Sequence, residues 1–75
     1  MTNLKQVRLQ KGLSQSQLAE KSGVGVRMLQ EYEQGRKAID GAKLNTLLNL
    51  ANALDCKLHE ILQDNELVEK AKTML

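Results

Sequence analysis

The feature that most constrains the fold is the stretch GLSQSQLAEKSGVGVRMLQEYEQG at residues 12–35, which starts, breaks and restarts a helix within a few turns. Ser14 is a favourable helix N-cap, and Gln17 stands at the matching third position of a capping box. Gly23 should stop this helix, because glycine adopts left-handed backbone without a Cβ penalty. A new helix can begin near Gly25. The spacing predicts two short helices joined by a tight turn, with the second projecting from the body.

The residues on either side of this stretch also indicate short helices. Asn3 and Gln6 form a capping-box pattern, so we expect a first helix from about residue 4 to 11, ended by Gly12. Asp40 is placed to cap a later helix, and Asp55 to close it, since aspartate tolerates left-handed geometry. That helix has the longest apolar stripe in the chain, formed by Leu44, Leu47, Leu48, Ala51 and Leu54.

Two apolar groups follow this helix. The first predicts a short fifth helix and comprises Leu58, Ile61 and Leu62. The second predicts an amphipathic tail helix and comprises Leu67, Val68, Ala71, Met74 and Leu75. We therefore divide the chain into a body at residues 1–63 and a tail at residues 64–75. The tail either packs on its own body or pairs with a second copy, and two apolar turns on so small a domain favour pairing.

The composition predicts a single all-α domain. The chain has 75 residues with no Pro, Trp or Phe, and 41% of them are hydrophobic while 27% are charged. These values are typical of a folded domain rather than a disordered segment. The apolar runs are too short for a membrane span or a signal peptide, and one cysteine excludes an internal disulfide. We expect a cytoplasmic protein with no membrane partner.

Positive charge is concentrated in the first half of the chain. Residues 1–37 contain seven Lys or Arg and three Glu, a net charge of +4, whereas residues 38–75 contain four Lys and six Asp or Glu, a net charge of −2. The total of +2 is modest. A basic half that includes the broken helix nevertheless suits a polyanionic partner.

Residue patterns for catalysis or metal binding are missing from the sequence. Cys56 and His59 are spaced as C-x-x-H, but no second pair of ligands accompanies them. We expect Cys56 to be a small buried hydrophobe and His59 to face solvent. No nucleophile–base set and no phosphate-cradling glycine loop occurs. We therefore predict no enzyme activity, no metal site and no cofactor.

Three segments in order, LSQSQLAEKSGV, VRMLQEYEQGRK and LNTLLNLANALDCKLHEIL, resemble the lambda-repressor/Cro family, also called the Xre family. The resemblance covers about residues 3–62. It implies a five-helix lambda-repressor-like fold, here with an additional C-terminal amphipathic helix. It also implies that the second and third helices form a helix-turn-helix, that the third enters the major groove of double-stranded DNA, and that a homodimer binds a near-palindromic operator.

The resemblance places base-reading residues on the outward face of the helix at residues 25–34, because Leu29 and Tyr32 should point into the core. The positions that map to base contacts are Val26, Arg27 and Glu31, with Met28 and Gln30 at the margin.

These side chains suit different base edges. Arg27 can donate two hydrogen bonds to guanine O6 and N7, which gives about 1–3 kcal/mol of discrimination. Val26 can contact a thymine methyl. Glu31 either accepts a hydrogen bond from cytosine N4, orients Arg27 one turn earlier, or forms an ordinary surface ion pair.

Other positions are expected to hold DNA without reading its sequence. In the family, the residue that matches Gln15 anchors to the DNA backbone, and the free N–H groups of that first helical turn can grip the same phosphate. Gln34, Arg36 and Lys37 follow the third helix and are expected to hold a second phosphate.

Arg8 and Glu33 match a family ion pair between the first helix and the end of the third. We interpret this pair as structural, since removal of one partner of a part-buried pair strands the other charge. Gly25 departs from the family, which usually has Ser or Thr at this cap position, at a cost of only tenths of a kcal/mol.

Together these inferences predict a sequence-specific DNA-binding transcriptional regulator that acts as a repressor. One alternative is a protein-interaction module of the same fold whose reading face has drifted. Another is an antitoxin that neutralises a toxin partner and also binds its own operator. The salt dependence of DNA binding and selection from random duplexes separate these hypotheses.

Overall fold

The structure is a computed structural model that describes residues 1–74, with Met74 described by its backbone alone. These residues form five α-helices and two single 3-10 turns, with no strand, so the prediction of an all-α fold is confirmed. The elements are α1 (Asn3–Gln10), α2 (Gln15–Ser22), α3 (Val26–Glu33), η1 (Ile39–Gly41), α4 (Leu44–Ala53), η2 (Leu58–Glu60) and α5 (Asn65–Met74). Within residues 1–74, no helix has the length and apolarity that a membrane crossing needs.

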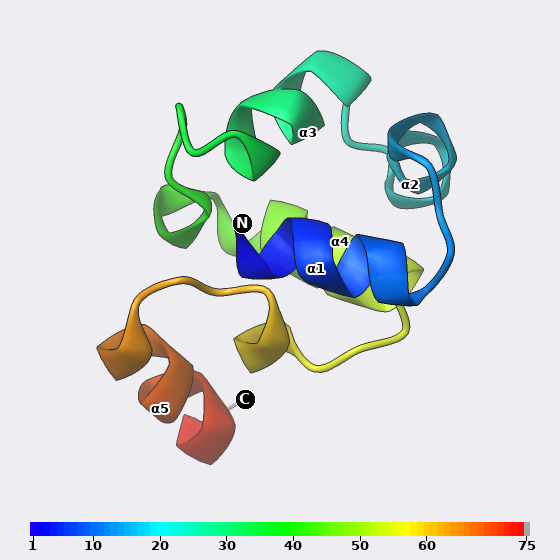
Figure 1. Ribbon diagram of the computed structural model, residues 1–75. Helices are drawn as coiled ribbons and strands as arrows, with labels where there is room; N and C mark the ends of the chain where they lie inside the picture. The colour runs from blue at the N-terminus through cyan, green and yellow to red at the C-terminus, as the bar shows by residue number, and fades with distance from the viewer. Residues whose placement is uncertain (75) are drawn as a thin grey trace.

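The core lies where the first four helices meet. Leu4, Leu18, Leu29 and Leu50, one from each of these helices, are fully buried. Burial of a leucine side chain contributes roughly 1.5–3 kcal/mol, so these contacts provide much of the driving force for folding. In Figure 1, α1 and α4 lie at the centre, with α2 and α3 on one side and α5 on the other. The helix α3 is therefore at the opposite end of the fold from α5.

Local residue choices produce the predicted break between α2 and α3. Ser14 Oγ accepts from the Gln17 backbone N–H at 3.0 Å, and Gln17 Oε1 accepts from the Ser14 backbone N–H at 2.8 Å, so the capping box is confirmed. Gly23 has a φ of 75°, the left-handed conformation that ends α2. Gly25 then precedes α3 without a side-chain cap. Figure 1 shows α2 end-on and α3 side-on, so the two helices cross rather than run parallel.

The predicted cap of α1 is wrong by one residue. Thr2 caps the helix, and its Oγ1 accepts from the Lys5 backbone N–H at 3.3 Å. Asn3 instead donates its Nδ2 to the Leu62 carbonyl at 2.8 Å. Both residue types are good caps. The long-range bond of Asn3 to the end of the body leaves the cap to Thr2.

Asp40 was expected to cap α4 but lies in η1. Its carboxylate oxygens accept from the backbone N–H groups of Gln63 and Asp64 at 2.8 and 3.0 Å. The helix α4 begins only at Leu44, after Lys43, and has no side-chain cap. Asp40 therefore ties η1 to the segment that leads into α5.

The leucines of α4 do not all face inward as predicted. Leu50 is fully buried, whereas Leu44 and Leu48 are 53% and 45% exposed, so the predicted stripe is wrong at these two positions. The remaining predicted members, Leu47, Ala51 and Leu54, are buried. Asp55 has a φ of 51° and closes the helix as predicted.

The predicted fifth helix is only the single turn η2, after which Ile61 and Leu62 are buried. The helix α5 packs against η2, with Ala71 buried and Leu67 and Val68 half-buried against the core. The tail thus packs on its own body, and its pairing with a second copy stays a prediction. The side chains of Met74 and Leu75, predicted for the same face, lie outside the described residues.

Candidate nucleic-acid interface

The helix α3 has one buried face and one exposed face. Leu29, Tyr32 and Glu33 are buried, as the sequence predicted for the first two. The opposite face exposes Val26, Arg27, Met28 and Gln30. Eight residues make a rod about 12 Å long. This rod presents apolar, cationic and amide groups, which can contact a partner that is polar and complementary to it in shape.

A buried ion pair holds the end of α3 against α1. Arg8 Nε donates to Glu33 Oε2 at 2.7 Å and Arg8 Nη2 donates to Glu33 Oε1 at 3.0 Å. The two side chains are only 8% and 1% exposed. Arg8 Nη1 also donates to the Leu13 carbonyl at 2.8 Å. This two-pronged contact, which the family resemblance implied, fixes the position of α3 on the body.

Gln15 connects α2 to the same pair. Its Nε2 donates to Glu33 Oε1 at 3.0 Å, and its Oε1 accepts from Gln30 Nε2 at 3.4 Å. Gln15, Gln30 and Glu33 thus come together, a grouping that sequence reasoning missed because the three residues are brought close only by the crossing of α2 and α3. One N–H of the Gln15 amide remains free of these two bonds.

Glu31 pairs with a residue beyond the helix. Glu31 Oε2 lies 3.8 Å from Arg36 Nη1. The Oε2 atom is shielded from solvent and has no hydrogen bond within the described residues. Arg27 forms no ion pair with Glu31 in the part of the chain that the structure describes. The hypothesis that Glu31 orients Arg27 is therefore not supported, and the Arg27 fork stays available.

A tight turn after α3 places basic residues at its end. Gly35 has a φ of 77°, and the backbone N–H groups of Arg36 and Lys37 both donate to the Glu31 carbonyl, at 3.1 and 3.2 Å. Arg36 and Lys37, together with Gln34, are exposed there. A polar hollow of about 310 Å³ lies beside them and is lined by Arg27, Gln30, Glu31, Gln34 and Arg36.

Cys56 and His59 lie away from this surface. Both are half-buried, so His59 is less exposed than predicted and Cys56 is less buried. Burial, followed by the charge of Glu60, raises the pKa of the Cys56 thiol. A raised thiol pKa favours the neutral form, which is a poor metal ligand. Across residues 1–74, no three His, Cys, Asp or Glu side chains gather as a metal site.

A short exposed helix, braced by a second helix across a tight turn, defines the helix-turn-helix class of DNA-binding domains. The profile of the Helix-turn-helix family HTH_3 matches residues 4–61. The chain therefore belongs to this family of Cro/C1-type (Xre) domains. Membership implies DNA binding and transcriptional regulation, and domains of this family are generally non-catalytic. Comparison with curated proteins and with solved structures gave no significant match.

Proposed function

We propose that this protein is a sequence-specific transcriptional repressor that inserts α3 into the major groove of its operator. The observation that carries the proposal is the exposed face of α3, where Val26, Arg27 and Gln30 are adjacent. The major groove of B-DNA is about 12 Å wide and admits one helix. A domain seated there excludes other proteins from the same DNA, which is the simplest route to repression.

Each outward side chain suits one kind of base edge. Arg27 is exposed, so its fork donates to guanine O6 and N7. Val26 is 41% exposed and contacts a thymine methyl, and Met28, which is 39% exposed, lies at the margin of the face. The Glu31 side chain, which is 36% exposed, accepts from cytosine N4 through its other carboxylate oxygen.

Phosphate contacts at both ends of the helix-turn-helix hold α3 in register. The free N–H of Gln15 and the backbone N–H groups of the first turn of α2 grip one phosphate. Gln34, Arg36 and Lys37 grip another beyond the end of α3, where the Arg36 side chain is 69% exposed. These contacts add affinity without sequence preference.

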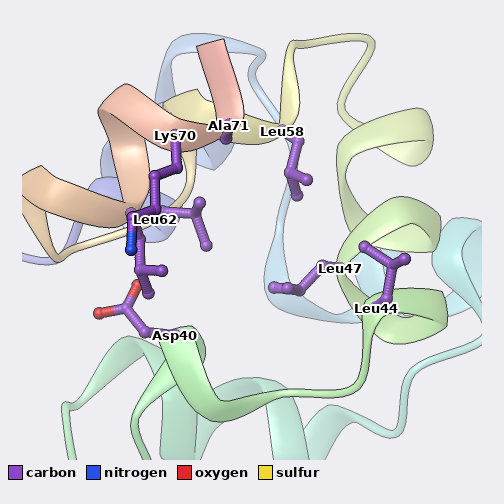
Figure 2. A pocket seen from close by; sticks show the side chains of 8 residues that line it. Asp40, Leu44, Leu47, Leu58, Leu62, Lys70 and Ala71 are labelled. Atoms are coloured by element: carbon purple, nitrogen blue, oxygen red, sulfur yellow. The ribbon is translucent and has the colours of Figure 1, made fainter. Parts of the chain in front are cut away.

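We propose that the protein binds as a homodimer through an apolar face on α4. Leu44 and Leu48 are exposed on α4, and Leu44 lines a groove of about 240 Å³ whose walls are mostly leucine. Figure 2 shows Leu44 and Leu47 on one side of this groove and Leu62 and Lys70 on the other. In a two-fold pair, the exposed leucines of α4 in one copy can fill the groove of the other copy. Two α3 helices about 34 Å apart would then read a near-palindromic site.

Selection from a library of random duplexes by the purified protein tests the proposed function. We expect enrichment of a near-palindromic motif, and an affinity that falls steeply with salt as counterions are released. Absence of any motif would contradict the proposal and favour the alternatives, a protein-interaction module or an antitoxin.

The Arg27→Ala variant tests the role of the reading face. We expect it to lose the preference at one base position, about 1–3 kcal/mol, and to keep the others. Lys72→Ala is the charge-matched control, because Lys72 is 47% exposed on α5, at the far end of the fold. It should leave the motif unchanged. Equal effects of both variants would mean that Arg27 contributes only charge.

A further inference from the structure

We propose that Gln30 reads an adenine, and that its amide is oriented for this task by a relay through Gln15 from the buried pair of Glu33 and Arg8. This inference rests on the proposed function and adds one base to it. The relay consists of four hydrogen bonds, which run from the interior of the domain to the exposed face of α3.

The relay begins at a group that can only accept hydrogen bonds. The ionised carboxylate of Glu33 accepts two bonds from Arg8 and a third from Gln15 Nε2 at 3.0 Å. A glutamine amide has a donor nitrogen and an acceptor oxygen, and only the nitrogen can face a carboxylate. Because Glu33 is 1% exposed and held by the guanidinium, the Gln15 amide has one favourable orientation.

The orientation of Gln15 is passed to Gln30. With its nitrogen turned inward, Gln15 presents Oε1 toward α3, and this oxygen accepts from Gln30 Nε2 at 3.4 Å. The bond is long and exposed, so it contributes little energy by itself. A flipped Gln30 amide, however, would place two acceptor oxygens against each other. Gln30 is therefore held with its nitrogen toward Gln15.

The oriented Gln30 amide still has one N–H and its Oε1 available on an exposed side chain. Adenine presents an acceptor at N7 and a donor at N6 in the major groove, which is the complementary pair. Guanine presents two acceptors, so Oε1 of Gln30 would face an acceptor and lose one bond. The relay thus favours adenine before DNA arrives, and little side-chain ordering remains to be done on binding.

The test is binding of the selected duplex with each of the four base pairs at every position in turn. Wild-type protein should show a preference for adenine at one position of each half-site, of about 5- to 150-fold. The Gln30→Ala variant should lose that preference and keep the others. Gln10→Ala, which removes an exposed glutamine from α1, is the matched control and should keep all of them.

Gln15→Ala separates positioning from anchoring. A residue that only grips a phosphate would weaken binding to all duplexes by the same factor. A positioning residue would, in addition, relax the adenine preference at the Gln30 position. Its removal leaves the Ser14 and Gln17 capping box intact, so α2 should still form.

The outcomes distinguish the relay from the proposed function. A motif that Gln30→Ala leaves unchanged overturns the adenine assignment alone, and Gln15→Ala with an intact adenine preference overturns the relay. A library with no enriched motif overturns the proposed function, and this inference with it. Loss of the same adenine preference in both variants, with the other positions kept, supports the proposal.

Discussion

The replacement of Glu33 with alanine tests the contact that fixes α3 on the body. The carboxylate accepts three hydrogen bonds, two from Arg8 and one from Gln15, and its side chain is 1% exposed. Without it, the Arg8 guanidinium keeps only the bond from Nη1 to the Leu13 carbonyl. The variant therefore contains a buried cation with no counter-charge.

The expected loss of stability is large for a domain of this size. Removal of one partner from a buried ion pair costs about 3–5 kcal/mol. The free energy of unfolding of a small domain is about 0.05–0.15 kcal/mol per residue, or roughly 4–11 kcal/mol for this chain. In domains of 60–100 residues, each 1 kcal/mol moves Tm by about 4–8 °C, so Tm should fall by at least about 12 °C.

Thermal unfolding followed by far-ultraviolet circular dichroism measures this change. Glu66→Ala is the matched control, since Glu66 is 78% exposed and pairs with Lys70 on the surface at 3.6 Å, where a pair contributes about 0–1 kcal/mol. Replacement of both Arg8 by Met and Glu33 by Leu removes both charges and should recover much of the loss. A Glu33→Ala variant that melts like the Glu66→Ala control would refute the reasoning.

Three further predictions concern the turns that position the helices. Ser14→Ala removes the cap of α2 and should lower the free energy of unfolding in urea by about 1 kcal/mol; an unchanged midpoint would contradict the role of the capping box. Gly23→Ala should cost about 1–2 kcal/mol from backbone strain alone, because φ is 75° and a Cβ would meet nothing within 4 Å. Asp40→Ala frees the N–H groups of Gln63 and Asp64, so amide exchange should become faster there and in α5; protection equal to wild type would show that the carboxylate does not hold α5.

Features encoded by neighbouring residues could be predicted from the sequence. The capping box at Ser14, the left-handed end of α2 at Gly23 and the closure of α4 at Asp55 all depend on one or two positions. Together with the apolar spacing they gave the order of the helices, although the predicted fifth helix is only the turn η2. The break between α2 and α3, which had the densest local signals, is the region that the sequence described best.

Features that depend on a distant partner could not be predicted in this way. Asn3 and Asp40 have good capping side chains, but each bonds to the segment at residues 62–64 instead. The buried stripe of α4 was predicted wrongly because two spacings fit a helix face. Leu48 lies four residues after Leu44, and Leu50 lies three residues after Leu47. The packing of α4 against α2 and η2 decides whether Leu48 or Leu50 is buried.

The candidate site shows the same division. The pairing of Arg8 with Glu33 was implied by the family resemblance and is present as a direct contact. The bonds of Gln15 arise from the crossing of α2 and α3, which no local pattern encodes. The partner of Glu31 is Arg36 rather than Arg27, because the turn at Gly35 folds the chain back toward α3.

The central claim is that the exposed face of α3 is the surface that meets DNA. Titration of the isotopically labelled protein with the selected duplex, followed by amide chemical shifts in NMR spectra, tests it most directly. We expect the largest shifts at residues 14–16 and 26–37, with smaller shifts in α4 and α5, whose side chains line the proposed dimer groove. Shifts centred on α5 or on the leucine groove of α4, with α3 unchanged, would contradict it.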